Sequence, residues 1–261
     1  MLMPSPILLA LLLLSPFLAA LLLALLPHAG RRTSAVVAGL GAAVGLAALL
    51  ALGPQVFAGE VPRFSAEWLP QLGLSFSLRL DGFAWMFALL VLGIGVLVVL
   101  YAHWYLGKDD PPRRFFATLA LFMGAMLGVV VSGNLLLLVV FWELTSISSF
   151  LLIGYWNHRS EARQGARMAL AVTGAGGLAL LAGVLMIGRV VGSFELDVVL
   201  ASATELQAHP LYGAILACVL VGAFAKSAQF PFHFWLPHAM AAPTPVSAYL
   251  HSATMVKCGV F

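Results

Sequence analysis

Charged residues are scarce in this sequence of 261 residues, where they make up 9% of the chain. Soluble domains carry about a quarter. Hydrophobic residues make up 62%, so the composition argues against a soluble domain and predicts an integral membrane protein in a lipid bilayer. The basic residues are spread over short loops and form no patch, so we expect no nucleic-acid partner despite the net charge of +3.

Residue patterns that carry metal, redox or nucleophilic chemistry are also missing. The two cysteines, Cys218 and Cys258, lie in apolar runs without CxxC spacing, which argues against a disulfide framework and against a zinc site. The sequence contains no nucleotide-binding loop, haem motif or nucleophile elbow. We therefore expect no cofactor, no bound metal and no enzymatic activity.

Apolar runs of about twenty residues predict an all-α integral membrane fold, a polytopic bundle of transmembrane helices. We expect about seven complete spans and the start of an eighth, with the seventh helix broken and the eighth truncated by the end of the sequence. The first run lacks a basic n-region and is expected to be a span rather than a signal peptide. The predicted spans cover residues 7–27, 34–57, 82–106, 115–133, 134–156, 168–189 and 211–231, with an eighth from about 244.

The chain is expected to divide into residues 1–133, with helices one to four and an outer loop at 58–80, and residues 134–261, with helices five to eight. Within the loop, leucine and phenylalanine alternate with small or polar residues, which predicts a short extramembrane β segment near 72–80, one arm of a hairpin. Small residues at Ala175, Ala179 and Gly183 predict a closely packed face on the sixth span.

Lysine and arginine are distributed unequally between the connections. Three occur in the second, fourth and sixth loops, and eight occur in the others: Arg31, Arg32, Lys108, Arg113, Arg114, Arg159, Arg163 and Arg167. The positive-inside rule then places the odd-numbered loops in the cytoplasm and the N-terminus outside a multi-pass cell membrane.

Three ionisable residues fall inside the predicted spans, namely Glu143, Lys226 and Lys257. Each charge at the centre of a span costs roughly 2.5–3.5 kcal/mol on insertion scales, so such residues usually face a protein interior or a water-filled path. Glu143 lies near the middle of the fifth span, and Lys226 lies midway along the seventh, before a break expected at Pro231. The two could form a static ion pair, or a switch that holds a proton while intact and releases it when broken. The helix break favours the switch, because a static pair does not need it.

The eighth span is expected to carry a polar stripe, because Ser247, His251, Thr254 and Cys258 recur at helical spacing, with Lys257 at its edge. We interpret the stripe as the wall of a hydrated channel in which His251 relays protons. His251 could instead be a structural histidine at a helix interface.

His233 and His238 flank the break in the seventh helix. They are either points at which protons enter the path or ordinary solvated loop residues.

Two segments, FWELTSISSFLLIGYW and KSAQFPFHFWLPHAMAAPTPVSAYLHSATMVK, resemble the antiporter-like proton-translocating subunits shared by respiratory complex I and the Mrp-type multisubunit cation/proton antiporters. The similarity is greatest to the A-type subunit of the Mrp antiporters, and Lys257 favours that type. The resemblance implies that Glu143 and Lys226 drive proton transfer and that His251 and Lys257 continue the hydrophilic path. It also implies that residues 134–261 form the first half of a proton channel and that the chain is an N-terminal fragment.

The predicted function is thus proton translocation within a hetero-oligomeric complex that exchanges Na⁺ or K⁺ for protons, with other membrane subunits as partners. One alternative is the large antiporter-like subunit, of the L type, of NADH-quinone oxidoreductase or of a related hydrogenase or carbon-uptake complex, a proton-pumping translocase. A more distant alternative is a seven-helix receptor or scaffold in which Glu143 and Lys226 form a static lock.

Overall fold

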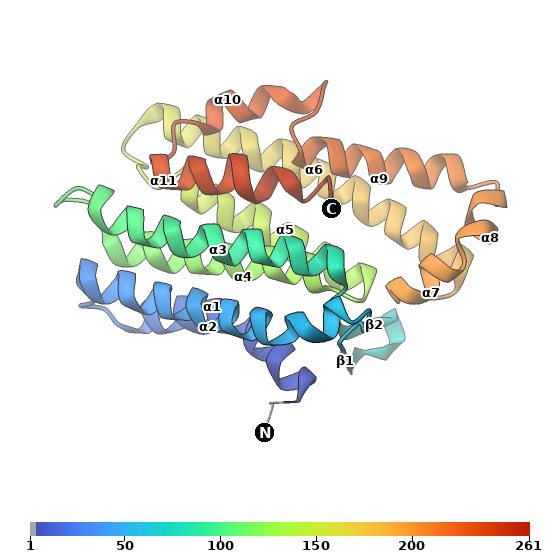
Figure 1. Cartoon of the computed structure of the whole chain (residues 1–261). Coiled ribbons are helices and arrows are strands. Elements are labelled where there is room, and N and C mark those ends of the chain that lie inside the picture. Colours follow the sequence, from blue (N-terminus) through green and yellow to red (C-terminus); the bar gives the residue numbers. More distant parts are fainter. Residues whose placement is uncertain (1–3) are drawn as a thin grey trace.

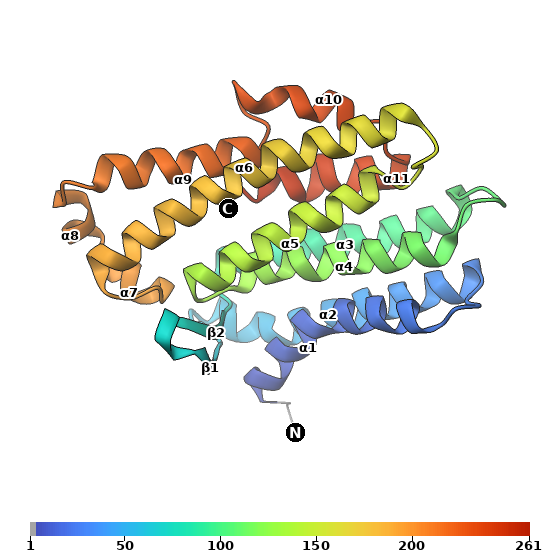
Figure 2. The ribbon, with the colours of Figure 1, turned by 180° about the vertical axis from the view of Figure 1, so that it is seen from behind.

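Six long apolar helices form the body of the computed structural model, which describes residues 4–261. Figures 1 and 2 show them running along a common direction as a bundle. Within the described residues these six are long and apolar enough to cross a membrane, and the predicted polytopic helix bundle is confirmed. They are α1 (Ser5–Leu25), α2 (Arg31–Phe57), α3 (Gly82–Tyr105), α4 (Pro112–Val131), α5 (Leu135–Ile153) and α6 (Ser160–Val191).

The two ends of the bundle differ. The α1–α2, α3–α4 and α5–α6 connections lie at one end, and a β hairpin lies at the other, together with the short helices α7 (Leu196–Ala201) and α8 (Ala203–Ala208) (Figure 1). The three arginine- and lysine-rich connections therefore share one end. This grouping agrees with the predicted topology, whose direction across the membrane stays a prediction.

Helix α4 is at the centre of the core. Its residues Phe115, Phe116, Leu119, Phe122 and Leu127 have no exposed surface, and α1, α2, α3 and α5 all pack against it. This burial follows from a helix that is apolar on every side and is surrounded by other helices. The division between residues 133 and 134 stays a prediction.

The hairpin consists of β1 (Arg63–Leu69) and β2 (Leu74–Arg79), which pair antiparallel. Strand β2 confirms the segment predicted near 72–80, and β1 is its partner arm. The hairpin is fastened to the helices because the Gly133 amide donates to the Ser77 carbonyl at 2.7 Å. It thus covers the α4–α5 turn, and Asp81 then caps α3 by accepting from the Ala84 amide at 2.8 Å.

The seventh helix is short and ends earlier than predicted. Helix α9 (Tyr212–Lys226) has 15 residues, about 22 Å at 1.5 Å per residue, against a hydrocarbon core of about 30 Å. It stops at Lys226, five residues before Pro231, and Ala228 then adopts a left-handed conformation with φ of 52°. The Trp235 indole donates to the Ala225 carbonyl at 3.0 Å, which satisfies one of the carbonyls that the helix end leaves free. The predicted break is therefore present, but its position is set by Trp235 as well as by proline.

The predicted regular eighth helix is wrong in its geometry. After α10 (Trp235–Ala239), helix α11 covers only Thr244–Ser247; a π-helical turn follows over Ala248–Ala253 and a 3-10 turn over Met255–Lys257. The wider turn and the kink at Thr254, with φ of −131°, break the α-helical spacing. Residues at i, i+4, i+7 and i+11 therefore do not form one stripe here.

Candidate functional site

Glu143 lies at the middle of α5 and points at α6. Helix α5 begins at a firm cap, because Asn134 Oδ1 accepts from the Leu136 amide at 3.0 Å. The Glu143 side chain is half-buried, and its Oε1 atom is buried without a hydrogen-bond partner in the part of the chain that the structure describes. A methyl group on Gly177 of α6 would overlap this oxygen. The carboxyl group thus occupies space that exists because residue 177 has no side chain.

Lys226 is the last residue of α9 and has no exposed surface. Its Nζ donates to Ser146 Oγ at 2.7 Å and to the Trp142 carbonyl at 3.0 Å, and lies 5.1 Å from the centroid of the Trp142 ring. A lysine at a helix C-terminus is favoured by the negative end of the helix dipole. Because a protonated lysine has three donors and two are used, one is left for another acceptor.

Glu143 and Lys226 reach the same turn of α5 without forming an ion pair. Within residues 4–261 the ion pairs shorter than 4.0 Å join Arg63 or Arg79 to Asp197, and Arg79 to Asp81. Lys226 instead binds neutral oxygen atoms of Trp142 and Ser146, the first beside Glu143 in the chain and the second one turn further on. The structure thus brings Glu143 and Lys226 to the same turn of α5. They do not pair, because the Glu143 carboxyl group points toward Gly177.

The close packing of α6 on α9 uses the predicted face only at Gly183, where an added methyl group would lie 3.0 Å from the Val219 side chain of α9. Ala175 is exposed, whereas Gly176 is buried, and a methyl group on Gly176 would overlap the Ala225 side chain. Gly176 and Gly177 thus bring α6 against the residue before Lys226 and against Glu143. The role of these two glycines could not be predicted from the sequence, because it depends on which helices lie opposite.

His251 lies on the π-helical turn, beside the end of α9. Its ring is 6.0 Å from the Trp235 ring in an edge-on arrangement, and its Nδ1 lies 3.3 Å from the Met240 sulfur. The Nε2 atom is buried and has no hydrogen-bond partner within residues 4–261. Trp235 therefore bridges the α9 end and His251, a position that sequence reasoning missed; the signal was a large aromatic residue inside the broken segment.

The remaining members of the predicted stripe are buried, but Lys257 at its edge is not. Ser247, Thr254 and Cys258 are buried, with Thr254 donating to the Tyr249 carbonyl at 2.7 Å, whereas the Lys257 side chain is exposed. The structure therefore brings Lys257 to the surface of the chain and not to the Lys226 amine.

His233 and His238 lie in the broken segment, outside the buried cluster. The His233 ring stacks on Phe230, and His238 is exposed. Among residues 4–261, no three His, Cys, Asp or Glu side chains lie close enough together to hold a metal ion.

The arrangement can do one kind of chemistry. The buried Lys226 amine binds two neutral acceptors on the α5 turn that carries Glu143, and Trp235 lies between the end of α9 and the His251 ring. Such groups can pass protons between them, because each can donate or accept and none is locked by a strong partner.

Comparisons with known proteins identify the family of this chain. Residues 132–261 match the family model described as NADH:quinone oxidoreductase/Mrp antiporter, TM, and residues 68–116 match NADH-Ubiquinone oxidoreductase (complex I), chain 5 N-terminus. The chain is 59% identical over 254 residues to a probable K(+)/H(+) antiporter protein, the A/B subunit, of Rhizobium meliloti, covering 97% of this chain and 25% of the relative. It is 48% identical over 213 residues to the A1 subunit of a Na(+)/H(+) antiporter of Staphylococcus aureus, covering 82% and 27%.

Solved structures with a similar fold belong to membrane complexes. A chain of the Mrp complex from Dietzia sp. DQ12-45-1b superposes with a TM-score of 0.82 at 37% identity, covering 95% of this chain and 27% of that one. A chain of the archaeal membrane-bound sulfane sulfur reductase has a TM-score of 0.81 at 23% identity, covering 96% and 39%, which shows a shared fold. The chain spans about a quarter of the length of the curated relatives it matches. It belongs to the family of antiporter-like membrane subunits that Mrp antiporters and NADH:quinone oxidoreductase have in common.

Proposed function

We propose that this chain is a proton-translocating part of a multisubunit monovalent cation/H⁺ antiporter, a transporter and not an enzyme. The names of its relatives support exchange of K⁺ or Na⁺ for protons. The observation that carries the proposal is Lys226, a fully buried lysine held by Ser146 Oγ and the Trp142 carbonyl instead of a carboxylate. A charge placed in this way at the end of a broken helix has a cost that a purely structural residue would not justify.

In the proposed mechanism the Lys226 amine moves between two sets of partners. In the first set the amine is bound to Ser146 and Trp142, as in the structure. In the second set it approaches the carboxyl group of Glu143, which lies on α5 together with Ser146 and Trp142. Formation of the pair holds the proton, and separation releases it toward His251, whose Nε2 has no partner. The side chain rotates on a fixed helix end, so no large movement of the helices is required.

Other residues take secondary roles in this proposal. His233 and His238 are points at which protons enter from the side of the arginine-rich loops, and Lys257 passes protons onward. The exposure of Lys257 supports a contact beyond the described helices, in keeping with other membrane subunits as partners. The odd-numbered loops face the cytoplasm and the N-terminus faces outward, by the count of lysine and arginine. Residues 1–133 support the half-channel built from residues 134–261.

Replacement of Lys226 by alanine in the antiporter complex that contains this chain is the direct test. We expect cation-driven proton movement, followed with a pH-sensitive dye in vesicles, to fall to background while the complex assembles normally. Lys108→Ala is the matched control, since Lys108 is an exposed loop lysine. Retained exchange by the Lys226 variant would refute the proposal.

A second candidate is the antiporter-like subunit of an NADH:quinone oxidoreductase, since both matching family models carry that description. Genomic neighbours separate the two. Genes for small antiporter membrane subunits beside this one favour the first function, and genes for quinone-binding and iron–sulfur subunits favour the second.

A further inference from the structure

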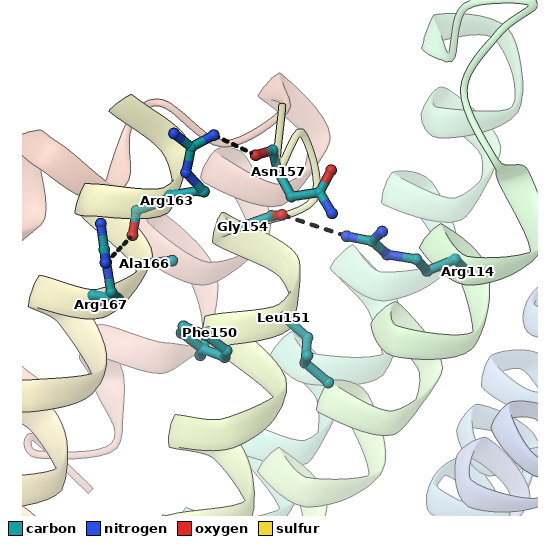
Figure 3. Close-up of a pocket in the computed structure, with 8 residues that line it drawn as sticks. All are labelled: Arg114, Phe150, Leu151, Gly154, Asn157, Arg163, Ala166 and Arg167. Carbon is teal, nitrogen blue, oxygen red and sulfur yellow. Dashed lines mark hydrogen bonds between the residues drawn. The ribbon is translucent and has the colours of Figure 1, made fainter. Parts of the chain in front are cut away.

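A basic pocket lies where α4, α5 and α6 meet (Figure 3), beside the α5–α6 connection at the end of the bundle opposite the hairpin (Figure 1). We define it by Arg114, Arg163 and Arg167 at its rim and by Phe150 and Leu151 at its base, and its volume is about 420 Å³. Arg114 extends from α4, and the other two arginines extend from α6 (Figure 3). The pocket contains no residue of the proposed proton path and does not depend on that proposal.

Among the described residues the three arginines have no acidic partner. Within residues 4–261 none of them lies within 4.0 Å of a carboxylate; each uses one nitrogen on a main-chain carbonyl. These bonds fix the side chains and leave other guanidinium nitrogens free for a ligand. They run from Arg114 to Tyr155 at 3.0 Å, from Arg163 to Asn157 at 2.7 Å, and from Arg167 to Arg163 at 3.3 Å.

The positions of these arginines in their helices are unfavourable without an anion. Arg114 is in the first turn of α4, where the helix dipole disfavours positive charge and the turn has no acidic residue, whereas Arg163 shares the first turn of α6 with Glu161. Arg163 and Arg167 are four residues apart on one helix face, so their charges repel one another. A bound anion would face two positive helix ends and three guanidinium groups, which removes both costs.

The base of the pocket is apolar and partly exposed. Leu151 is 39% exposed on the side of α5, and Phe150 is half-buried beside it. A ligand that fits both parts has a phosphate at one end and a hydrocarbon chain at the other. We propose that the basic pocket binds an anionic phospholipid, with its phosphate on the three arginines and an acyl chain along Phe150 and Leu151.

The test uses the antiporter complex in lipid nanodiscs and a phosphatidylglycerol probe with a photoreactive group on its acyl chain. After irradiation, peptide mass spectrometry should find the probe on the segment that contains Phe150 and Leu151. Arg163→Gln combined with Arg167→Gln should reduce this labelling about 10- to 30-fold, from the loss of two basic contacts to the lipid. The matched control, Arg32→Gln with Lys108→Gln, removes two charges from the same end outside the pocket and should leave the labelling within about twofold of the wild type.

Four results would overturn the proposal. The first is equal labelling of the segment by a phosphatidylcholine probe, and the second is a control variant that loses as much labelling as the pocket variant. The third is removal of the labelling by inorganic phosphate but not by chloride at the same ionic strength, which would assign the pocket to free phosphate. The fourth is labelling that occurs only after a neighbouring protein is stripped from the complex, which would assign the pocket to a protein interface.

Discussion

Charged side chains at the hairpin end and charged side chains inside the bundle are held in opposite ways. At the hairpin end, Asp197 accepts from Arg63 Nε and from Arg79 Nε, each at 2.8 Å, and all three side chains reach solvent. Inside the bundle, Lys226 is fully buried and binds only neutral oxygen atoms, while Glu143 Oε1 has no partner.

This difference separates charges that hold the fold together from charges that can change their protonation. Exposed ion pairs are individually weak because water screens them. Their rearrangement therefore changes the free energy of the protein little. A buried charge on neutral acceptors is less strongly held than one fixed by an opposite charge, and can therefore move to another partner. The hairpin charges thus fasten β1 and β2 to α7, and the interior charges are suited to transfer.

After Lys226→Ala, the largest effect is expected from Glu143→Gln, which keeps the side-chain size and removes the charge. If the acid is the second partner of Lys226, exchange in vesicles should fall roughly 100-fold, as is common for the loss of a proton-transfer group. Glu161→Gln, at the exposed start of α6, is the control and should behave as the wild type. Normal exchange by the Glu143 variant would show that Glu143 is no more necessary for exchange than the surface residue Glu161.

Gly177→Ala tests whether the space that accommodates the Glu143 carboxyl group matters. The added methyl group would overlap Oε1, so the carboxyl group must move, and we expect exchange to fall roughly tenfold. Gly174→Ala is the matched control on the same helix, because a methyl group there meets nothing within 4 Å. Equal behaviour of the two variants would show that the carboxyl position is unimportant.

Ser146→Ala removes one of the two neutral acceptors of Lys226. The Trp142 carbonyl remains, so we expect a change in exchange rate of roughly threefold, with a shifted pH profile. Ser148→Ala serves as control, since its hydroxyl donates only to carbonyls of its own helix. An unaltered rate and pH profile in the Ser146 variant would show that its hydroxyl does not position the amine.

The smallest effect is expected at the hairpin end. Hydrogen bonds from Arg63 and Arg79 lower the pKa of Asp197, so this carboxylate stabilises the fold above the pKa of its unfolded form and loses that contribution as the pH falls below about 4. Asp197→Asn should therefore reduce stability by about 0–1 kcal/mol at pH 7, with exchange unchanged. Thermal unfolding at pH 7 and at acidic pH should show the difference between variant and wild type shrinking with acidification.

The interior charges could be found from the sequence, because a charge in an apolar run is conspicuous and costly. The polytopic bundle and the β2 strand followed from hydrophobic period and run length in the same way. The end of α9 at Lys226 could not be predicted, since it depends on the Trp235 indole reaching Ala225 from ten residues away. The π-helical turn around His251 also leaves no periodic signal, and the fit of Glu143 against Gly177 depends on which helices become neighbours.

The contrast between the two sets of charges depends on whether Glu143 and Lys226 transfer protons or lock two helices together. We would measure both exchange and assembled yield for Glu143→Gln, Lys226→Ala and the double variant in the complete complex. We expect all three to assemble normally and all three to lose exchange. Poor assembly of each single variant, restored in the double variant, would show a static ion pair and contradict proton transfer by these residues.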